Sequence, residues 1–324
     1  RLIQYGLGQQ GAGTSRDVAI ADLDGDGLKD VVVSDSDAAR MIVFKQRKGI
    51  GLEQGEAFSG LVGADQIRAA DLDGNGSAEV VVLSTKEKTI GVSRMAEGRL
   101  TFPQALPMGG KEPIALELAD LDNDKKPEVI YLTKARSARE TTYTFEALHR
   151  AANGNWEPHQ FDGKPSVTLE LKSSPNRIQR FDVNGDGKPE FMIFGGSDKA
   201  PSLFSLDEKG VPKELKTEGG IQLGNVSPGA IFFGQAPNPT LLIAQDKFVR
   251  NMRFDEPARG WQVADQFNVS EATAKTVGAA TINLDGKPGN EIVLIDVGVQ
   301  KLKVLRLEEG VYRAWQEVEL GRFP

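Results

Sequence analysis

The chain has 324 residues, a net charge of −7 and no cysteine. Apolar residues make up 39% of it, which is enough for a large core, and the missing thiols exclude disulfides, zinc–thiolate sites and a thiol nucleophile. The acidic balance argues against a nucleic-acid partner, and no apolar run approaches the length of a membrane span.

One pattern recurs along the chain, in which a short apolar run is followed by an acidic loop and then by a β-branched or apolar run. In the first copy the loop 22–30 precedes Val31-Val32-Val33. The other acidic loops are 71–79, 120–128, 182–190 and, in a weaker form, 283–291. A further copy near Phe232 keeps the strand-like runs but has no acids. With Phe232 aligned to Asp22, the copies begin at 22, 71, 120, 182, 232 and 283, so six units fill the chain.

Each unit contains about four strand signals, which in the first unit lie near 16–21, 30–35, 40–46 and 54–59. The second strand of each unit is almost continuously apolar, as expected for a strand that is covered on both faces. No segment has a sustained helical period. Repeated four-stranded units predict an all-β fold, a β-propeller of four-stranded blades, better than a β-sandwich, which does not require identical units.

We therefore expect a single propeller domain over 1–324. Its blades are expected at about 16–60, 66–107, 113–171, 176–222, 226–268 and 276–321. The pattern detects six blades and leaves a seventh open, as it leaves open whether the chain is part of a longer protein.

The third unit is longer than the others by about a dozen residues, which lie between 134 and 161. Asn153-Gly154 is a favoured hairpin turn, so we expect an elongated hairpin insertion that stands out of its blade. It carries both histidines of the chain, His149 and His159. These are either ordinary polar residues of a surface hairpin, which we favour, or an acid–base pair or metal site.

The first acidic loop has carboxylates at positions 1, 3, 5 and 9 and Gly27 at position 6, where a loop that wraps an ion needs a positive φ. Such a set of hard oxygen ligands suits Ca²⁺ better than a transition metal. Without a cation, carboxylates this close would repel one another and their pKa values would rise. The second residue is apolar in all five acidic loops, and we expect it to pin each loop to the core.

These loops resemble those of the FG-GAP/VCBS repeat family, the calcium-loop propellers best known from integrin α-subunit heads. In that family the loop Asp-x-Asp-x-Asp-Gly-x-x-Asp joins the first and second strands of a blade and holds Ca²⁺. The resemblance implies about four structural calcium sites, and it implies no catalytic or organic-cofactor residue. The implied ligands are Asp22, Asp24, Asp26, Leu28 (carbonyl) and Asp30 in the first loop, Asp71, Asp73, Asn75, Ser77 (carbonyl) and Glu79 in the second, Asp120, Asp122, Asp124, Lys126 (carbonyl) and Glu128 in the third, and Asp182, Asn184, Asp186, Lys188 (carbonyl) and Glu190 in the fourth.

Two loops depart from this pattern. The third has Lys125 where glycine is expected, so we expect a lysine in the left-handed region at a cost of about 1–2 kcal/mol. The last has Asn283 at position 1 and Lys287 at position 5, and the Lys287 ammonium is a candidate to replace the metal.

Two functional hypotheses follow. The first is a non-enzymatic, calcium-stabilised propeller that serves as a binding or scaffold module for a protein or glycan partner. The alternative is a propeller-based carbohydrate-active enzyme, a polysaccharide lyase or hydrolase, which needs a convergent acid–base set. An extracellular or periplasmic location is expected, because such sites suit millimolar calcium.

Overall fold

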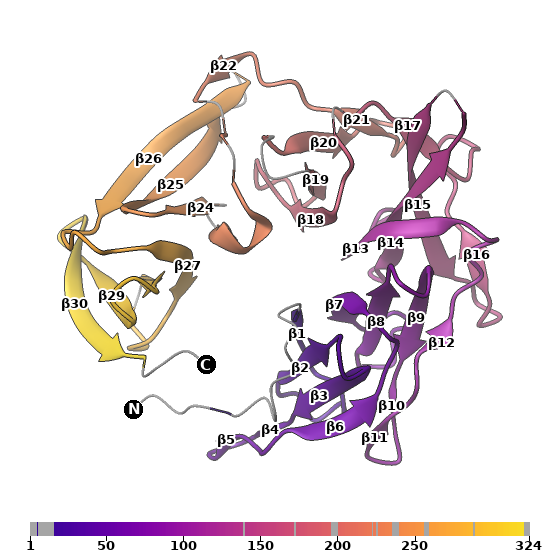
Figure 1. Ribbon diagram of the computed structural model, residues 1–324, viewed down its shortest axis with the longest axis horizontal. Coiled ribbons are helices and arrows are strands. Elements are labelled where there is room, and N and C mark those ends of the chain that lie inside the picture. Colours follow the sequence, from indigo (N-terminus) through magenta and orange to yellow (C-terminus); the bar gives the residue numbers. More distant parts are fainter. Residues whose placement is uncertain are drawn as a thin grey trace. The chain divides into compact units, whose positions relative to one another are not determined.

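The computed structural model of the chain describes residues 5, 16–138, 140–171, 173–195, 200–221, 223–224, 226–234, 240–255, 259–287 and 289–320 (Figure 1). The regular elements of these residues are strands, apart from one 3₁₀ turn, η1 (Pro228–Ala230). No helix in the described segments has the length and hydropathy needed to cross a bilayer.

The first three sheets are antiparallel and follow one another along the chain. The first has the order β1-β2-β3-β6, from β1 (Val18–Ala21), β2 (Asp30–Asp35), β3 (Arg40–Phe44) and β6 (Glu56–Ser59), with a small ribbon of β4 (Gln46–Arg47) and β5 (Gly51–Leu52). The second has the order β7-β8-β9-β12, from β7 (Ala64–Ala70), β8 (Glu79–Ser84), β9 (Thr89–Ser93) and β12 (Gln104–Ala105), with a ribbon of β10 (Met95–Ala96) and β11 (Arg99–Leu100). The third has the order β13-β14-β15-β16, from β13 (Glu112–Ala119), β14 (Glu128–Arg136), β15 (Thr141–Arg150) and β16 (Trp156–Pro158), and β17 (Val167–Leu169) also pairs with β15.

The next three sheets have the same plan. The fourth has the order β18-β19-β20-β21, from β18 (Arg177–Phe181), β19 (Glu190–Phe194), β20 (Ser202–Leu206) and β21 (Pro212–Glu214). The fifth has the order β23-β24-β25-β26-β22, from β22 (Gly219–Gly220), β23 (Ile231–Gly234), β24 (Thr240–Gln245), β25 (Phe248–Asp255) and β26 (Gly260–Asn268). The sixth has the order β27-β28-β29-β30, from β27 (Thr276–Ile282), β28 (Glu291–Asp296), β29 (Lys301–Glu308) and β30 (Val311–Glu319). The described residues thus form six blades, and the predicted fold class, an all-β propeller of four-stranded blades, is confirmed.

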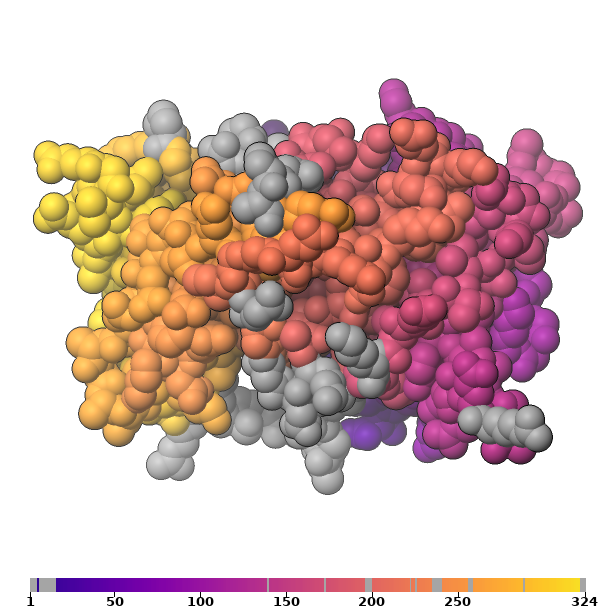
Figure 2. Space-filling view, turned by 90° about the horizontal axis from the view of Figure 1, so that it is seen from above, coloured from indigo at the N-terminus to yellow at the C-terminus, as the bar shows by residue number. Residues whose placement is uncertain are grey.

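Two compact units make up the chain. Unit 1 spans Ile3–Arg180 and Ser205–Lys213, and unit 2 spans Phe181–Phe204 and Glu214–Pro324. Unit 1 contains the first three sheets, and unit 2 contains the fifth and sixth, which are orange and yellow in the space-filling view (Figure 2).

The second strand of each blade is the most deeply buried one, as the sequence predicted. All six residues of β8 and all five of β19 are buried. In unit 1, Val32 and Val43 of the first sheet pack in one cluster with Ile67, Val80 and Val82 of the second. Each such strand lies between two layers of apolar side chains, which explains its continuous apolar sequence.

The acidic loops are the connections between the first and second strands of their blades. In four of the five loops the residue that precedes the loop pairs in register with position 9: Ala21 with Asp30, Ala70 with Glu79, Ala119 with Glu128 and Ile282 with Glu291. These four loops are therefore closed at their base by the ladder of their own sheet.

The segment that we expected as a hairpin insertion, 134–161, is largely built into the third blade. β15 is the third strand of that blade, and it pairs with β14 along Val129–Arg136. The Asn153-Gly154 turn connects β15 to the short β16, and β17 continues the outer edge beside Tyr143–Phe145. The extra residues lengthen the hairpin of β14 and β15 and divide the outer strand of the blade into β16 and β17. The added backbone groups find their hydrogen-bond partners within the sheet.

One arginine with little solvent exposure, Arg68, links the first strands of neighbouring blades in unit 1, which we call the inner strands. The Arg68 side chain, 14% exposed, donates to Glu117 Oε1 at 3.0 Å, to Asp17 Oδ2 at 3.1 Å and to the Ile178 carbonyl at 3.3 Å. Arg177 Nη2 donates to the same aspartate at 2.8 Å. The inner strands are thus joined by charge-assisted hydrogen bonds in addition to apolar contacts.

Replacing Arg68 by Met should lower the free energy of unfolding by about 3 kcal/mol, because Glu117 would keep a buried charge without its partner. Urea unfolding measures the loss. The matched control is Arg180→Met on the same group of strands, because the Arg180 side chain is exposed, and we expect a change below about 0.5 kcal/mol. Equal losses in the two variants would contradict this role of Arg68.

Candidate metal centres

All five acidic loops share one buried hydrogen bond. The carboxylate at position 9 accepts from the backbone amide at position 2, across the base of the loop. The five donor–acceptor distances are 3.1 Å for Leu23–Asp30, 2.9 Å for Leu72–Glu79, 2.7 Å for Leu121–Glu128, 2.7 Å for Val183–Glu190 and 2.8 Å for Leu284–Glu291. Each of these carboxylates is buried, so we call this contact the position-9 clamp.

The aspartate at position 1 organises the rest of the loop. Asp22 Oδ1 accepts from the amides of Gly25 at 2.7 Å and Asp26 at 3.2 Å, and its Oδ2 accepts from Gly27 at 2.8 Å. Asp71 and Asp182 have the same three contacts in the second and fourth loops. The loops thus use backbone amides to hold their carboxylates close together.

The residue at position 5 fixes position 7, the residue whose carbonyl the family resemblance assigns to the ion. Its side-chain oxygen accepts from the position-7 amide at 2.7–2.9 Å in each of the first four loops. These pairs are Asp26–Leu28, Asn75–Ser77, Asp124–Lys126 and Asp186–Lys188.

The third loop differs because it has no glycines. Lys125 has a φ of 70°, so the predicted left-handed lysine is confirmed, and Asn123 at position 4 is also left-handed with a φ of 63°. Of the contacts that position 1 makes in the other loops, only the bond from the Lys125 amide to Asp120 Oδ2, at 2.9 Å, is retained. Asp120 Oδ1 is left buried without a hydrogen-bond partner.

The loops bring ligand oxygens together in the way that a cation needs. Ligand atoms lie within 4.8 Å of one another in three groups: Asp22, Asp24 and Asp30; Asp71, Asp73 and Glu79; and Asp120, Asp122 and Asp124. The fourth loop has Asn184 in the central place, next to Asp182 and Asp186. Asp24 Oδ1, like Asp120 Oδ1, is buried and has no hydrogen-bond partner. These orphaned acceptors fit a cation that coordinates them, and oxygen-rich loops of this kind fit Ca²⁺.

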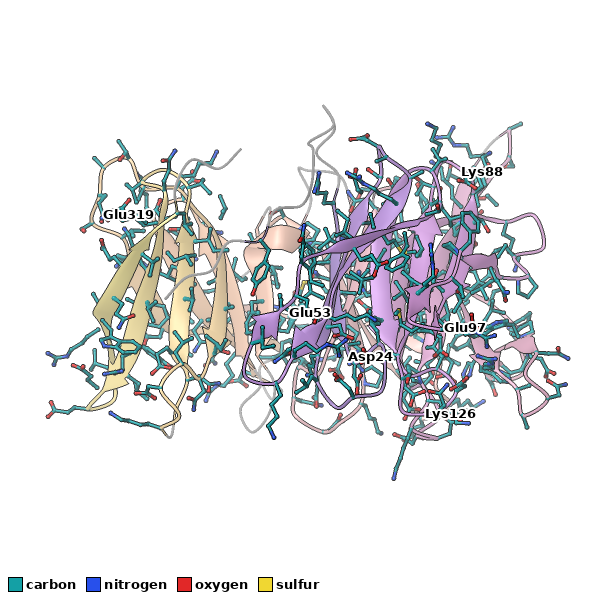
Figure 3. The ribbon with its side chains drawn as sticks, turned by 90° about the horizontal axis from the view of Figure 1, so that it is seen from below. Asp24, Glu53, Lys88, Glu97, Lys126 and Glu319 are labelled. Atoms are coloured by element: carbon teal, nitrogen blue, oxygen red, sulfur yellow. The ribbon has the colours of Figure 1, made fainter. Side chains whose placement is uncertain are left out.

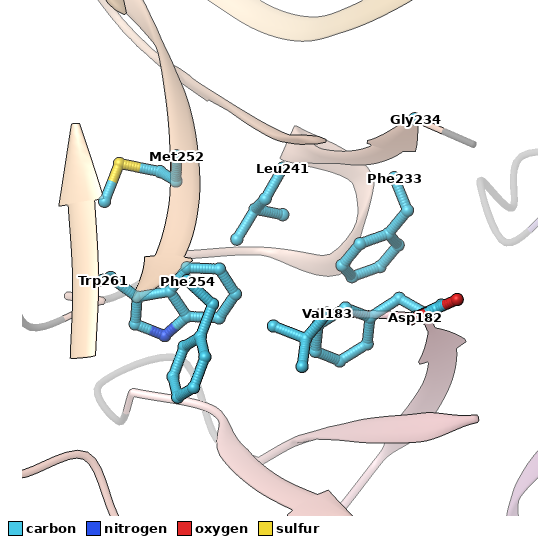
Figure 4. A pocket seen from close by; sticks show the side chains of 9 residues that line it. Asp182, Val183, Phe233, Gly234, Leu241, Met252, Phe254 and Trp261 are labelled. Atoms are coloured by element: carbon cyan, nitrogen blue, oxygen red, sulfur yellow. The ribbon is translucent and has the colours of Figure 1, made fainter. Parts of the chain in front are cut away.

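The predicted pinning of the loops by position 2 is confirmed for three of them. Leu23 and Leu72 are buried in unit 1, and Val183 is buried in unit 2. Val183 points into an aromatic cluster in which the rings of Phe181 and Phe233 stack at 4.6 Å, beside a cavity of about 20 Å³ (Figure 4). That volume holds a single water at most, so this cavity is a packing defect and not a ligand site. Leu284 is 48% exposed, so the last loop is not pinned in this way.

Basic side chains reach three of the loops, and sequence reasoning missed all three arginines. Arg47 Nη1 lies 3.0 Å from Asp26 and 3.4 Å from Asp24. Arg150 Nη1, from the neighbouring blade, lies 3.2 Å from Asp73. In the last loop, Asp285 contacts Lys287 at 3.8 Å and Arg306 more closely at 3.1 Å. Lys287 therefore lies beside the acids as we expected, but Arg306 is the nearer cation.

His159 lies beside the third loop. A ligand atom of its ring lies within 4.8 Å of carboxylate oxygens of Asp122 and Glu128. Its partner histidine, His149, is 6.5 Å away between ring centroids. Our preferred sequence interpretation, an ordinary surface hairpin, did not foresee this contact, because the sequence separation gives no signal for it.

Three of the position-9 carboxylates, Asp30, Glu79 and Glu128, have raised pKa values, and burial is the largest cause. Burial raises the pKa of Asp30 and of Glu79, although the backbone hydrogen bonds that these carboxylates accept lower it. For Glu128, burial raises the pKa from 4.5 to about 7, with smaller contributions from Asp122 and Asp124. The repulsion that the sequence predicted is thus present, but it is the lesser effect.

The other notable site of unit 1 is a cleft of about 840 Å³ at the opposite end of the blades. Figure 3 shows Asp24 and Lys126 of the loops at one end and Lys88 of the cleft at the other. The lining residues are Lys88, Gly110, Lys111, Glu112, Thr133, Lys134, Ala135, Arg136, Thr144, Glu146 and Ser166. Both carboxylates in the lining are paired, Glu112 with Lys88 and Glu146 with Lys111.

Comparison with known proteins gives a family for part of the chain and a fold for most of it. The FG-GAP-like repeat family matches residues 22–82 and 71–131. Among curated proteins, none matches the chain by sequence.

Three solved structures illustrate the likeness in fold. A functionally unknown protein from Desulfotomaculum acetoxidans has a TM-score of 0.51 and 13% identity, over 89% of this chain and 78% of its own. BBS1N in complex with ARL6DN has a TM-score of 0.53 and 11% identity, over 89% and 76%. A putative 6-phosphogluconolactonase from Bacteroides uniformis has a TM-score of 0.53 and 13% identity, over 93% and 85%. Identities this low establish a shared fold alone.

In protein stripped of metal, the free energy of unfolding should fall as the pH rises from about 4.5 to about 7. The folded chain holds a proton on Glu128 in this range, because its pKa is raised from 4.5 to about 7, and the unfolded chain has released it. The stability that this group contributes below pH 4.5 is therefore lost as the pH passes through 7.

Urea unfolding between pH 4.5 and 8 in a chelator measures this slope. Glu128→Gln keeps an acceptor for the Leu121 amide and should flatten the dependence of the unfolding free energy on pH. The control Glu97→Gln, at an exposed turn, should keep the wild-type dependence. A Glu128→Gln profile that overlays the wild type would show that Glu128 does not titrate in this way.

Proposed function

Since the chain carries FG-GAP-like repeats over residues 22–131 on a β-propeller scaffold, we propose that it is a calcium-stabilised, non-enzymatic binding or scaffold module. Its partner would be a protein or a glycan. The observation that carries this proposal is the repeated loop, whose carboxylates are clustered around a common point and include buried acceptors without a hydrogen-bond partner.

Calcium would act on stability in this proposal. Ca²⁺ is a hard cation that takes oxygen ligands, and the first, second and fourth loops supply carboxylate, amide and carbonyl oxygens from short stretches of chain. A bound ion would neutralise each cluster and tie the loop to the two strands that it connects. An extracellular or periplasmic location accords with sites of this type, which suit millimolar calcium.

The cleft of unit 1 is the surface that we propose for the partner. Hydroxyl, ammonium, guanidinium and carboxylate groups line it, which is a lining that suits the polar rim of a protein or the hydroxyls of a glycan. A binding role is favoured over the alternative, a polysaccharide lyase or hydrolase, because Glu112 and Glu146 are each engaged by a lysine. A general base needs a carboxylate that is free to accept a proton.

The calcium part of the proposal is tested by thermal melting in millimolar calcium and in chelator. We expect calcium to raise the Tm, since an ion at a hundredfold excess over its Kd contributes about 2.7 kcal/mol per site. Asp24→Ala with Asp26→Ala should remove part of this gain. Asp285→Asn is the matched control, because Arg306 already neutralises that aspartate, and it should keep the full gain. Melting that is the same with and without chelator would argue strongly against structural calcium.

The binding part is tested with a glycan array and a pull-down, both with the full chain in calcium. We expect a retained partner to bind about tenfold more weakly to the double variant Lys134→Ala, Arg136→Ala, which corresponds to about 1.4 kcal/mol. Lys216→Ala, an exposed lysine outside the cleft, should bind like the wild type. Cleavage of a retained glycan by the wild-type chain would instead favour the enzyme.

A further inference from the structure

The third acidic loop contains a nitrogen ligand that the other loops lack. His159 follows β16, 31 residues beyond Glu128 in the sequence, and its ring faces the carboxylates of Asp122 and Glu128 within 4.8 Å. Its backbone amide donates to the Ala147 carbonyl at 2.9 Å, and its ring meets Phe161 edge to face at 4.9 Å. The imidazole is thus held in place from its backbone and from one side of its ring.

The ring nitrogens of His159 are available for coordination. Among the described residues, neither nitrogen has a hydrogen-bond partner. An imidazole nitrogen whose lone pair is free is among the commonest metal ligands in proteins.

The third loop also differs from the first, second and last loops in the cations that lie beside its acids. Ion pairs are formed by Arg47 in the first loop, by Arg150 in the second and by Arg306 in the last. Within the described part of the chain, no lysine or arginine lies within 4 Å of the carboxylates of Asp120, Asp122, Asp124 or Glu128. Independently of the histidine, Asp120 Oδ1 is a buried acceptor without a partner in the same loop. A bound cation would coordinate this orphaned oxygen and balance the carboxylate of buried Glu128.

We propose that the third loop binds a divalent transition-metal ion of the zinc type through Asp122, Glu128 and His159, in place of calcium. Imidazole nitrogen is a preferred ligand of zinc and its neighbours, whereas Ca²⁺ takes oxygen. Three protein ligands leave a fourth tetrahedral position, which a water can take. This inference rests on the proposed function only in taking the loop as a metal site.

The composition makes the proposal simple to test. The chain has 2 histidines and no cysteine, so a zinc site with an imidazole or thiolate ligand must use His149 or His159. We therefore suggest titrating Zn²⁺ into the chelator-stripped full chain in the presence of millimolar Ca²⁺. Isothermal titration calorimetry gives the stoichiometry and affinity, and the NMR signals of the two imidazoles identify the ligand.

The expected result is one tight Zn²⁺ per chain, with a large shift of the His159 ring signals and little displacement by calcium. His159→Gln should weaken Zn²⁺ binding at least about tenfold, whereas the matched variant His149→Gln should bind like the wild type. Asp122→Asn, at an exposed loop position, should also weaken Zn²⁺ binding and provides a second variant if His159→Gln folds poorly.

Three results would overturn the inference: no Zn²⁺ binding, equal Zn²⁺ affinity in the wild type and His159→Gln, or displacement of Zn²⁺ by millimolar calcium. The failure of the proposed function gives a different outcome. In that case calcium would leave the Tm of the wild type and of His159→Gln unchanged, while Zn²⁺ would still bind through His159.

Discussion

The position-9 clamp is the interaction on which the blades of this protein depend. A buried carboxylate holds the amide at the start of its loop, and it does so at the point where the first and second strands of the blade begin to pair. This contact sets the loop length and aligns the two strands in one step. It also places a charge in a site with little solvent, which is costly unless a cation or further hydrogen bonds balance it.

The chain balances these buried charges in several ways. Backbone amides from Leu23 and Gln46 satisfy Asp30, and guanidinium groups approach the acids of the first, second and last loops. Between the inner strands of unit 1, the Arg68 guanidinium balances the charges of two poorly exposed carboxylates, Asp17 and Glu117. The third loop has neither glycines nor a guanidinium, and an imidazole faces its acids. The same loop motif thus has a different electrostatic environment in each blade, and the environment decides which cation fits.

Much of the fold and of the loop chemistry could be predicted because the signals are local and repeated. The blade units, the covered second strands, the pinning by Leu23 and Leu72 and the left-handed Lys125 all follow from residues within one repeat. The arginines could not be predicted, since Arg150 and Asp73 are 77 residues apart. The insertion between 134 and 161 was misplaced in part, because a favoured turn at Asn153-Gly154 identifies a hairpin and does not reveal which sheet it extends.

The sequence by itself determined the repeat, the four-stranded blades and the acidic loops with their oxygen ligands, because periodic apolar runs and Asp-Gly turns act over a few residues. Only the tertiary structure decided which cation each loop has beside it. Packing of neighbouring blades and of the split outer strand of the third blade brings Arg150 to one loop and His159 to another. Such contacts depend on side chains that reach across sheets, and no local pattern in the chain encodes them.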